Sequence, residues 1–523
     1  MSKAFVQGRK LARVYQMPYD LRHGALLGIS ILICVCGCGR DSDENRTLFV
    51  RLTADRTGID FANTLEPTEE LNTYLFRNFY NGGGVAIGDI NNDGLPDIVL
   101  TGNQVSNKLY LNTGDLTFRD ITEEAGIQSE GIWSTGVTMA DVNGDGWIDV
   151  YICKSGPPGG DRRHNELFIN NHDNTFSEKA DEYGLAVTAL SIHASFFDYD
   201  RDGDLDMYLL SNPIRSIDEV RRLPGLRSIR DPDGGNKLFR NELIPNATLE
   251  REATDEESTP LFTEVLTDVG IYSSAIGFGL GVSVADVNRD GWQDIYVSND
   301  FFERDYLYVN NRDGSFGEVL PQVIGGISLS SMGGDIADLN NDGYPEIFVS
   351  DMLPTESGRL QSKMSFATWN EYAATISDGY HHQFSRNTLQ LNRGPITAAS
   401  GPPTYQDSVS SLFFSEVGRM AGVEATDWSW GGLFADFDLD GHRDLFVPNG
   451  IYKDLLDQDF ITYMSDPEIL RGIVTGSTEP IMSILEELPS NPIPNHVFAG
   501  TADLVFRDSS NAWGLAEPSF SSG

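Results

Sequence analysis

Six short acidic segments recur along the chain, and the spacing of their oxygen-bearing side chains indicates cation binding. Each segment has a carboxylate or amide at positions 1, 3 and 5, a glycine at position 6 and a carboxylate at position 9. The first reads Asp89-Ile-Asn-Asn-Asp-Gly-Leu-Pro-Asp97. The other five begin at Asp141, Asp198, Asp286, Asp338 and Asp436.

This spacing suits calcium, which takes roughly 6–8 oxygen ligands and is bound by loops that aim alternate side chains at one point. Glycine at position 6 permits the sharp turn, and position 7 offers its backbone carbonyl. The pattern is similar to the first half of an EF-hand loop, although it lacks the glutamate at position 12. About one calcium ion is predicted per loop. The predicted ligands are Asp89, Asn91, Asp93, Leu95, Asp97, Asp141, Asn143, Asp145, Trp147, Asp149, Asp198, Asp200, Asp202, Asp204, Asp206, Asp286, Asn288, Asp290, Trp292, Asp294, Asp338, Asn340, Asp342, Tyr344, Glu346, Asp436, Asp438, Asp440, His442 and Asp444.

An alternative interpretation is a row of Asp-Gly hairpin turns, which need no metal. Without a cation, however, three acids brought within hydrogen-bonding range would disfavour their ionised state. The sixfold repetition of the acids therefore favours calcium.

The residues around each loop predict an all-β fold. A small or apolar run such as Gly84-Val-Ala-Ile precedes the loop, and a β-rich run such as Ile98-Val-Leu follows it. A third run such as Lys108-Leu-Tyr-Leu and a fourth that begins at Phe118 complete the unit. Four strands per repeat predict a β-propeller with six full repeats, a seventh cut short, and short helical insertions. The units lie near 78–130, 131–185, 186–270, 271–325, 326–420 and 421–515.

In these loop and strand residues, the units resemble the FG-GAP or VCBS repeats of integrin-α-type propellers. The chain from about Phe49 onward also resembles the N-terminal part of bacterial surface proteins that end in an ASPIC/UnbV domain. The shared motifs are Asn78-Phe-Tyr-Asn-Gly-Gly-Gly-Val, Gly379-Tyr-His-His-Gln-Phe and Thr426-Asp-Trp-Ser-Trp. That group is defined by its architecture and implies no particular activity.

The first residues have the pattern of an export signal. Five basic residues from Lys3 to Arg22 precede an apolar stretch from Ala25 to Gly37, which is too short to span a bilayer but suits a signal peptide. The stretch runs into Cys38 through a sequence similar to a bacterial lipobox. Residues 1–38 are therefore predicted to be a signal peptide with a lipobox, with lipidation of Cys38 and a tether at 39–47. An ordinary signal peptide cut nearby is the alternative.

Cysteine usage and charge agree with an exported protein that does not bind nucleic acid. Processing would leave Cys38, which is acylated, and Cys153, so no disulfide framework is expected. The formal net charge of −41 repels nucleic acid, which attracts basic surfaces.

The propeller is predicted to span residues 48–523. Residues 48–52 read as a strand that completes the last blade of the ring or, alternatively, caps its N-terminus. The last residues, from Gly514 onward, match stretches that lead into a first strand elsewhere, so a seventh unit is expected to begin there.

Three long insertions, 212–235, 351–386 and 450–494, all fall between the second and third strands of their units. Because each strand reverses direction, they are expected at the end of the propeller opposite the calcium loops. The aromatic spacing from Phe366 to Ile376 predicts a helix packed on the propeller. We interpret the His381-His382 pair as structural in preference to a metal site. We expect the arginines near 221 to form ion pairs in preference to an anion site. The candidate ligand-contacting residues on this face are Arg221, Arg222, Tyr380 and His382.

The sequence has no Gly-x-Ser-x-Gly elbow, His-Glu-x-x-His motif or phosphate loop. It favours a non-catalytic, lipid-anchored protein of the outer membrane or cell surface that binds a glycan or protein. The alternative is a calcium-dependent polysaccharide lyase or hydrolase on a propeller scaffold, because a fold does not fix a function.

Overall fold

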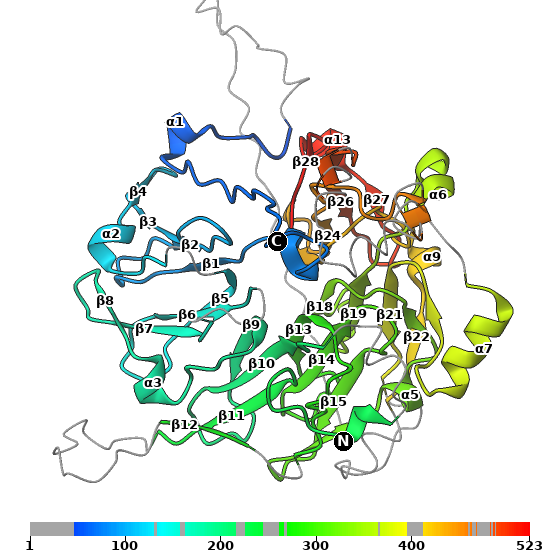
Figure 1. The fold of residues 1–523 in the computed structure, drawn as a ribbon, viewed down its shortest axis with the longest axis horizontal. Coiled ribbons are helices and arrows are strands. Elements are labelled where there is room, and N and C mark those ends of the chain that lie inside the picture. Colours follow the sequence, from blue (N-terminus) through cyan, green and yellow to red (C-terminus); the bar gives the residue numbers. More distant parts are fainter. Residues whose placement is uncertain are drawn as a thin grey trace, which may run out of the picture. The chain divides into compact units, whose positions relative to one another are not determined.

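The computed structural model describes most of the chain from Thr47 onward (Figure 1). Its described residues are 47–129, 133–156, 163–215, 225–243, 261–265, 269–363, 367–394, 412–458, 461–462, 467, 482, 485–486 and 488–522. Cys38, Arg221, Arg222 and Phe366, on which predictions were made above, lie outside this part of the chain. No helix in the described residues is long and apolar enough to cross a membrane.

The described residues form six four-stranded antiparallel sheets, which are the blades of a β-propeller (Figure 1). In every blade the strands follow one another in chain order. The blades are β1–β4 (Val85–Gly88, Asp97–Leu100, Lys108–Asn112, Phe118–Asp120), β5–β8 (Ser134–Ala140, Asp149–Lys154, Glu166–Asn170, Phe176–Glu178), β9–β12 (Leu190–Phe197, Asp206–Asn212, Lys237–Asn241, Phe262–Glu264), β13–β16 (Gly279–Ala285, Asp294–Asn299, Tyr306–Asn310, Phe316–Glu318), β18, β19, β21 and β22 (Gly333–Ala337, Glu346–Ser350, Thr388–Asn392, Phe414–Glu416), and β23, β24, β26 and β27 (Leu433–Ala435, Asp444–Val447, His496–Ala499, Arg507–Asp508). We number these blades 1 to 6, and the predicted all-β propeller is confirmed.

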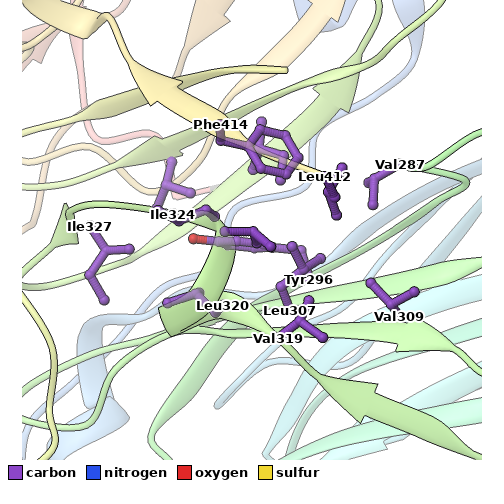
Figure 2. Close-up of a cluster of buried hydrophobic side chains, with 13 residues drawn as sticks. Val287, Tyr296, Leu307, Val309, Val319, Leu320, Ile324, Ile327, Leu412 and Phe414 are labelled. Atoms are coloured by element: carbon purple, nitrogen blue, oxygen red, sulfur yellow. The ribbon is translucent and has the colours of Figure 1, made fainter. Parts of the chain in front are cut away.

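Apolar side chains from facing blades fill the space between them. Figure 2 shows this for blades 4 and 5, where Phe414 of blade 5 packs near Tyr296 and Leu307 of blade 4. Strands such as β14 and β15 are buried along their whole length, which explains why their sequences read as continuous β-formers. Five clusters of this kind join consecutive blades from 1 to 6.

The antiparallel order places the two kinds of connection at opposite ends of each blade. We call the end with the turns between first and second strands the loop end. The other end carries the connections between second and third strands, including all three long insertions, and we call it the insertion end. The predicted separation of acidic loops and insertions is thereby confirmed.

Short additional elements decorate the blades. One-turn helices follow the fourth strands, and two helices lie in the insertion of blade 5. Two-stranded pairings join β17 to β20 and β25 to β28. The bounds are α1 Ala54–Thr57, α2 Thr122–Ala125, α3 Ala180–Tyr183, α5 Leu320–Val323, α6 Ser357–Lys363, α7 Trp369–Ser377, α9 Gly418–Ala421, α13 Ser510–Trp513, η2 Arg77–Tyr80, η3 Leu226–Ser228, β17 Ile327–Ser328, β20 Gln383–Phe384, β25 Ile493–Pro494 and β28 Pro518–Ser519.

The helix predicted in the insertion of blade 5 is present as α7, but its expected packing is wrong. None of its residues is buried, and Trp369 is 77% exposed. A capping box at Thr368 and Glu371 holds the first turn. The helix is therefore stabilised locally, and its aromatic residues remain available at the surface.

An asparagine at the end of the third strand ties each of four blades to the blade before it. Its side-chain amide donates to a backbone carbonyl in the acidic loop of the preceding blade. That carbonyl belongs to the buried residue at position 2 of the loop. Asn112, in blade 1, instead donates to Pro96 of its own blade at 2.9 Å, and blade 6 has Gly500 at this place. The four bonds between blades are Asn170–Ile90 at 2.8 Å, Asn241–Val142 at 3.1 Å, Asn310–Tyr199 at 2.8 Å and Asn392–Val287 at 2.8 Å.

We expect Asn310→Ala to lower the free energy of unfolding by about 1–3 kcal/mol, because it leaves the buried Tyr199 carbonyl without its donor. Asn112→Ala is the matched control, since its amide makes no bond to another blade, and it should cost less. Urea unfolding of both variants measures the difference. Equal losses would show that these amides do not hold neighbouring blades together.

Candidate functional site

The six acidic segments all form the turn between the first and second strands of a blade, so the structure places them together at the loop end. Within a loop the first, third and fifth side chains are fixed by backbone N–H groups. In the first loop the Asp93 and Gly94 N–H groups donate to the two oxygens of Asp89 at 3.1 and 2.7 Å. The Asp93 N–H also reaches Asn91 Oδ1 at 3.1 Å, and the Leu95 N–H reaches Asp93 Oδ1 at 2.8 Å. The same bonds recur in the loops that begin at Asp141, Asp286 and Asp338.

The carboxylate at position 9 joins its loop to the third strand of the same blade. In blade 1 one oxygen of Asp97 accepts from Ile90 N–H at 3.0 Å, and the other accepts from Asn112 N–H at 2.7 Å. Burial raises the pKa of this carboxyl group in all six loops, and the neighbouring acids of the loop add to the effect. The pKa reaches about 7 for Asp149 and about 8 for Asp206 and Glu346. A cation beside these groups would favour their ionised form.

Position 4 of each loop has a left-handed backbone, and its side chain reaches toward the loop of the next blade in four of the six cases. Asn92 donates to the carbonyl of Gly146 at 3.2 Å, and Asn341 donates to that of Gly441 at 3.4 Å. In two other loops an arginine lies over the aromatic ring at position 7 of the next loop. The six positive φ angles are 59° at Asn92, 70° at Gly144, 62° at Arg201, 60° at Arg289, 59° at Asn341 and 60° at Leu439. Sequence reasoning missed this position, because only its asparagines and glycine are residue types that favour such a backbone.

Two of the loops bring three carboxylates close enough to share one ion. The groups are Asp198, Asp200 and Asp206 in blade 3 and Asp436, Asp438 and Asp444 in blade 6, with ligand atoms within 4.8 Å of one another. In the other four loops position 3 is an asparagine. Oδ1 of Asp198 and Oδ1 of Asp200 are buried without a hydrogen-bond partner. Unpartnered buried oxygens on hard carboxylate ligands fit a divalent cation such as calcium.

Basic side chains approach the position 5 carboxylate in two loops. Arg312 donates to Asp290 at 2.9 Å, and His172 Nε2 lies 3.1 Å from Asp145. Both residues come from the turn after the third strand. In the loop of blade 4 the Arg312 guanidinium thus balances part of the negative charge.

At the insertion end, Tyr380 and His382 make contacts that position the insertion of blade 5. The Tyr380 ring packs against Phe302 with centroids 5.3 Å apart, and the Arg227 guanidinium lies over it. His382 Nδ1 lies 2.7 Å from the Tyr372 hydroxyl. His381 Nε2 lies 2.8 Å from the carbonyl of Ile324, which supports the structural interpretation of the histidine pair.

Two arginines of the insertion in blade 3, Arg227 and Arg230, form ion pairs with glutamates. Arg227 forms a bidentate pair with the buried Glu303 at 2.7 and 3.0 Å, and Arg230 pairs with Glu264. This agrees with the prediction of ion pairing in preference to an anion site for these two residues.

Ion pairs connect the insertion of blade 5 to residues of blade 6 and its insertion. Arg359 on α6 contacts Asp427 at 2.5 Å and Asp454 at 3.2 Å, and Lys363 contacts Asp457 at 2.5 Å. These groups are mostly shielded from water, so the pairs hold α6 firmly against blade 6. These pairs connect α6 to residues just before blade 6 and within its insertion.

Aromatic side chains of α7 and β20, also in the insertion of blade 5, form a row that we call the aromatic row: Trp369, Tyr372 and Phe384. The Trp369 and Tyr372 rings lie 5.8 Å apart, and the Tyr372 and Phe384 rings lie 6.2 Å apart at 35°. Trp369 is 77% and Phe384 is 40% exposed. Arg386 lies over the Phe384 ring. The sequence predicted that this helix packs on the propeller, because helical spacing alone does not tell which face of a helix is covered.

Comparison with known proteins matches the FG-GAP-like repeat family to residues 89–152 and 286–349. Both matched stretches begin at the first aspartate of an acidic loop and extend into the second strand of the next blade. The chain is a β-propeller that carries FG-GAP-like repeats.

Curated relatives agree with this assignment over parts of the chain. Integrin alpha-6 of Homo sapiens is 38% identical over 107 residues, which cover 18% of this chain and 9% of that protein. Cartilage acidic protein 1 of Xenopus tropicalis is 28% identical over 231 residues, covering 43% of this chain and 30% of that protein. Each alignment spans less than a third of the relative's own length. A solved rhamnogalacturonan lyase is 12% identical with a TM-score of 0.31, covering 72% of this chain and 57% of its own, a likeness that carries no argument about activity.

We expect calcium to raise the melting temperature of the protein by many degrees over the chelated form. A ligand that binds only the native state adds about 2.7 kcal/mol per site at a hundredfold excess over Kd. Melting with calcium and with chelator measures the shift. An unchanged melting temperature after verified metal removal would mean that the loops are hairpin turns only.

A pair of substitutions in the loop of blade 6 makes this test residue-specific. Asp436→Asn should reduce the calcium-dependent shift, since every loop has aspartate at position 1. Asp438→Asn should retain most of it, because four loops have asparagine at position 3. For each variant, the quantity compared is the difference in melting temperature between the calcium-bound and the chelated protein.

Proposed function

We propose that the protein is an exported, calcium-binding, lipid-anchored cell-surface propeller that binds a glycan or protein ligand without converting it. In this account the loop end binds about one calcium ion per loop, and the insertion end binds the ligand. The resemblance to integrin-α-type propellers supports a binding role. Calcium acts as a structural ion that neutralises the loop carboxylates.

The observation that carries the proposal is the aromatic row at the insertion end. Trp369 and Phe384 expose ring surface, and a capping box holds the first turn of the helix that carries Trp369 and Tyr372. Exposed aromatic residues supply large contact areas with few rotatable bonds. Rings of this kind stack on the apolar faces of sugars and on apolar side chains of proteins. Binding residues also concentrate on loops over a rigid scaffold.

The acids of the repeats lie away from the aromatic row. The paired carboxylates of the repeats lie at the loop end, where backbone N–H groups hold them as candidate ion ligands. The aromatic row lies at the other end of the blades. Polysaccharide cleavage would need an acid or base beside the bound sugar. The loop carboxylates are not placed for that task, whereas Glu371 on α7 and His382 lie beside the row, so a search for sugar products distinguishes binding from cleavage.

Membrane anchoring rests on the N-terminal sequence. Residues 25–37 are apolar, follow a basic segment and lead into Cys38. A lipid at Cys38, with a tether at 39–47, would hold the propeller at the outer membrane or cell surface. A single acyl chain anchors only weakly, so the proposal implies more than one chain on this residue.

We expect Trp369→Ala to weaken ligand binding at least tenfold, because the substitution removes the most exposed ring of the aromatic row. Alanine keeps the helix, since it is the best helix former. Binding to immobilised bacterial and extracellular polysaccharides and matrix proteins is the measurement. Leu116→Ala is the matched control, as Leu116 is 59% exposed in a turn at the loop end. Loss of binding in Leu116→Ala but not in Trp369→Ala would contradict the assignment, and calcium-dependent release of sugar products would support the lyase or hydrolase alternative.

The anchor has its own test. Labelled fatty acid should enter the wild-type protein in cells and be absent from Cys38→Ser, which should also leave the membrane fraction. Equal labelling of both proteins would refute lipidation at this residue.

A further inference from the structure

A pocket of about 180 Å³ lies at the insertion end, apart from the aromatic row. Leu190 at the start of β9, Asn212 at the end of β10 and Phe278 just before β13 line it, so the pocket lies where blades 3 and 4 meet. Residues 74–78, which precede blade 1 and include the start of η2, and residues 213–215 complete the lining. The pocket therefore belongs to the end of the propeller that carries the insertions.

The charge of this pocket is opposite in sign to that of the whole protein. Its charged lining residues are Arg77 and Arg215, and no acidic residue lines it, although the chain has 78 aspartate and glutamate residues against 37 lysine and arginine residues. Arg215 is exposed and forms no ion pair with another described residue. We call this site the arginine pocket. Its composition favours an anionic ligand.

Arg77 stacks on an aromatic ring and is partly balanced by an acid outside the pocket. Its guanidinium carbon lies 4.9 Å from the centroid of the Phe301 ring, and Phe301 packs against Phe278 of the lining with centroids 5.2 Å apart. Burial raises the pKa of Asp300 to about 6, and the nearby Arg77 charge acts against this rise. Asp300 does not line the pocket. Arg215 therefore carries the charge that no described acid balances.

Asn212 adds an unsatisfied polar atom to the lining of the arginine pocket. The residue is 4% exposed, and its Oδ1 is buried with no hydrogen-bond partner among the described residues. Its backbone pairs with Leu190 where β9 and β10 meet, which fixes its position. Buried acceptors normally have a donor. A hydroxyl group of a bound ligand would supply one.

The segment that lines the other part of the pocket is held in place. Asn72 is buried, and its Oδ1 accepts from the N–H groups of Tyr74 at 3.0 Å and Leu75 at 3.2 Å. The Phe76 ring packs edge-on against Trp133 with centroids 5.1 Å apart. Tyr74 and Leu75 themselves are 43% and 48% exposed. They present apolar surface beside the two arginines.

A larger cavity of about 440 Å³ has basic groups that already have partners. Arg227, Arg230 and Lys237 are among its lining residues. Arg230 pairs with Glu264, which also lines the cavity, and Arg227 pairs with Glu303. Lys237 Nζ donates to a backbone carbonyl at 2.7 Å. The arginine pocket, and not this cavity, is therefore the candidate anion site.

We propose that the arginine pocket binds a hexuronate residue of an acidic glycan. The sugar carboxylate pairs with Arg215 and Arg77, because guanidinium groups bind carboxylates through charge-assisted hydrogen bonds that are often bidentate. A ring hydroxyl donates to Asn212 Oδ1, and the carbon face of the ring lies against Tyr74 and Leu75. An acidic side chain of a protein offers a carboxylate but no hydroxyl-bearing ring beside it. The inference rests on the proposed binding role of the insertion end and adds the charge and chemical class of a ligand.

Binding of defined oligouronates tests the proposal. Oligomers of glucuronate, galacturonate and mannuronate are titrated into the protein in calcium-containing buffer by isothermal titration calorimetry, each beside its carboxyl-reduced, neutral counterpart. At least one oligouronate should bind, and its neutral counterpart should bind at least about tenfold more weakly, because hydrogen bonds between charged groups are lost. Arg215→Gln should weaken binding of that oligouronate by a similar factor and leave the melting temperature unchanged.

Arg419→Gln is the matched control, because Arg419 is exposed on α9 and its replacement changes the net charge by the same amount. It should leave oligouronate binding unchanged. Equal weakening by Arg215→Gln and Arg419→Gln would reveal a general charge effect and overturn the proposal. Cyclohexanecarboxylate should bind more weakly than monomeric glucuronate, since it has no hydroxyl for Asn212. Equal binding of these two, or tighter binding of polyglutamate than of every oligouronate, would overturn the sugar as the ligand.

The outcome can be told apart from failure of the proposed function. If no oligouronate binds, while another glycan or a matrix protein binds and is lost in Trp369→Ala, the arginine pocket is wrong and the binding role stands. If an oligouronate binds and is weakened by Arg215→Gln but not by Trp369→Ala, the arginine pocket is supported and the aromatic row is not part of that site. If no probe binds at all, both proposals fail.

Discussion

Electrostatic repulsion within the six acidic loops is the constraint on which the rest of the structure depends. Each loop concentrates three or more carboxylates in nine residues, and the ninth is buried in every blade. Backbone N–H groups take up part of the charge, yet burial still raises the pKa of the ninth carboxyl group, to about 8 in Asp206 and Glu346. A further source of positive charge would favour the ionised form of these groups, and we propose that calcium supplies it with the oxygen coordination that the spacing offers.

Hydrogen bonds also connect each loop to its own blade and, in several blades, to a neighbouring one. The carboxylate at position 9 is bonded to the third strand, and the asparagine that ends this strand in four blades reaches the preceding loop. Position 4 reaches the following loop in four blades, by a hydrogen bond at Asn92 and Asn341. Order in one loop is therefore coupled to order in its neighbours by direct hydrogen bonds. Cys153 is the sole cysteine in the described residues, so these hydrogen bonds, and not disulfides, connect neighbouring blades there.

The fold was predictable because the same pattern of strands and loop recurs six times. A strand that is unclear in one copy could be assigned from the same position in the other copies. The phenylalanine of the fourth strand and the separation of loops from insertions followed from that pattern alone. Contacts between blades were not predictable, since Asn310 and Tyr199 lie 111 residues apart and their approach depends on how blades stack. The left-handed backbone at Arg201, Arg289 and Leu439 had no signal in residue type. Trp369 was misplaced because the spacing of its helix did not reveal that the helix stands at the surface. Lipidation of Cys38 and the ligand-contacting roles of Arg221 and Arg222 stay predictions.

The central claim is that each acidic loop binds a calcium ion, and the most direct measurement is the number of ions per chain. Equilibrium dialysis against calcium, followed by elemental analysis of protein and dialysate at matched concentration, gives that number without reference to stability. The account predicts about six ions per chain, falling by one in Asp436→Asn. A value near zero at millimolar calcium, in protein whose fold is intact by circular dichroism, would contradict it.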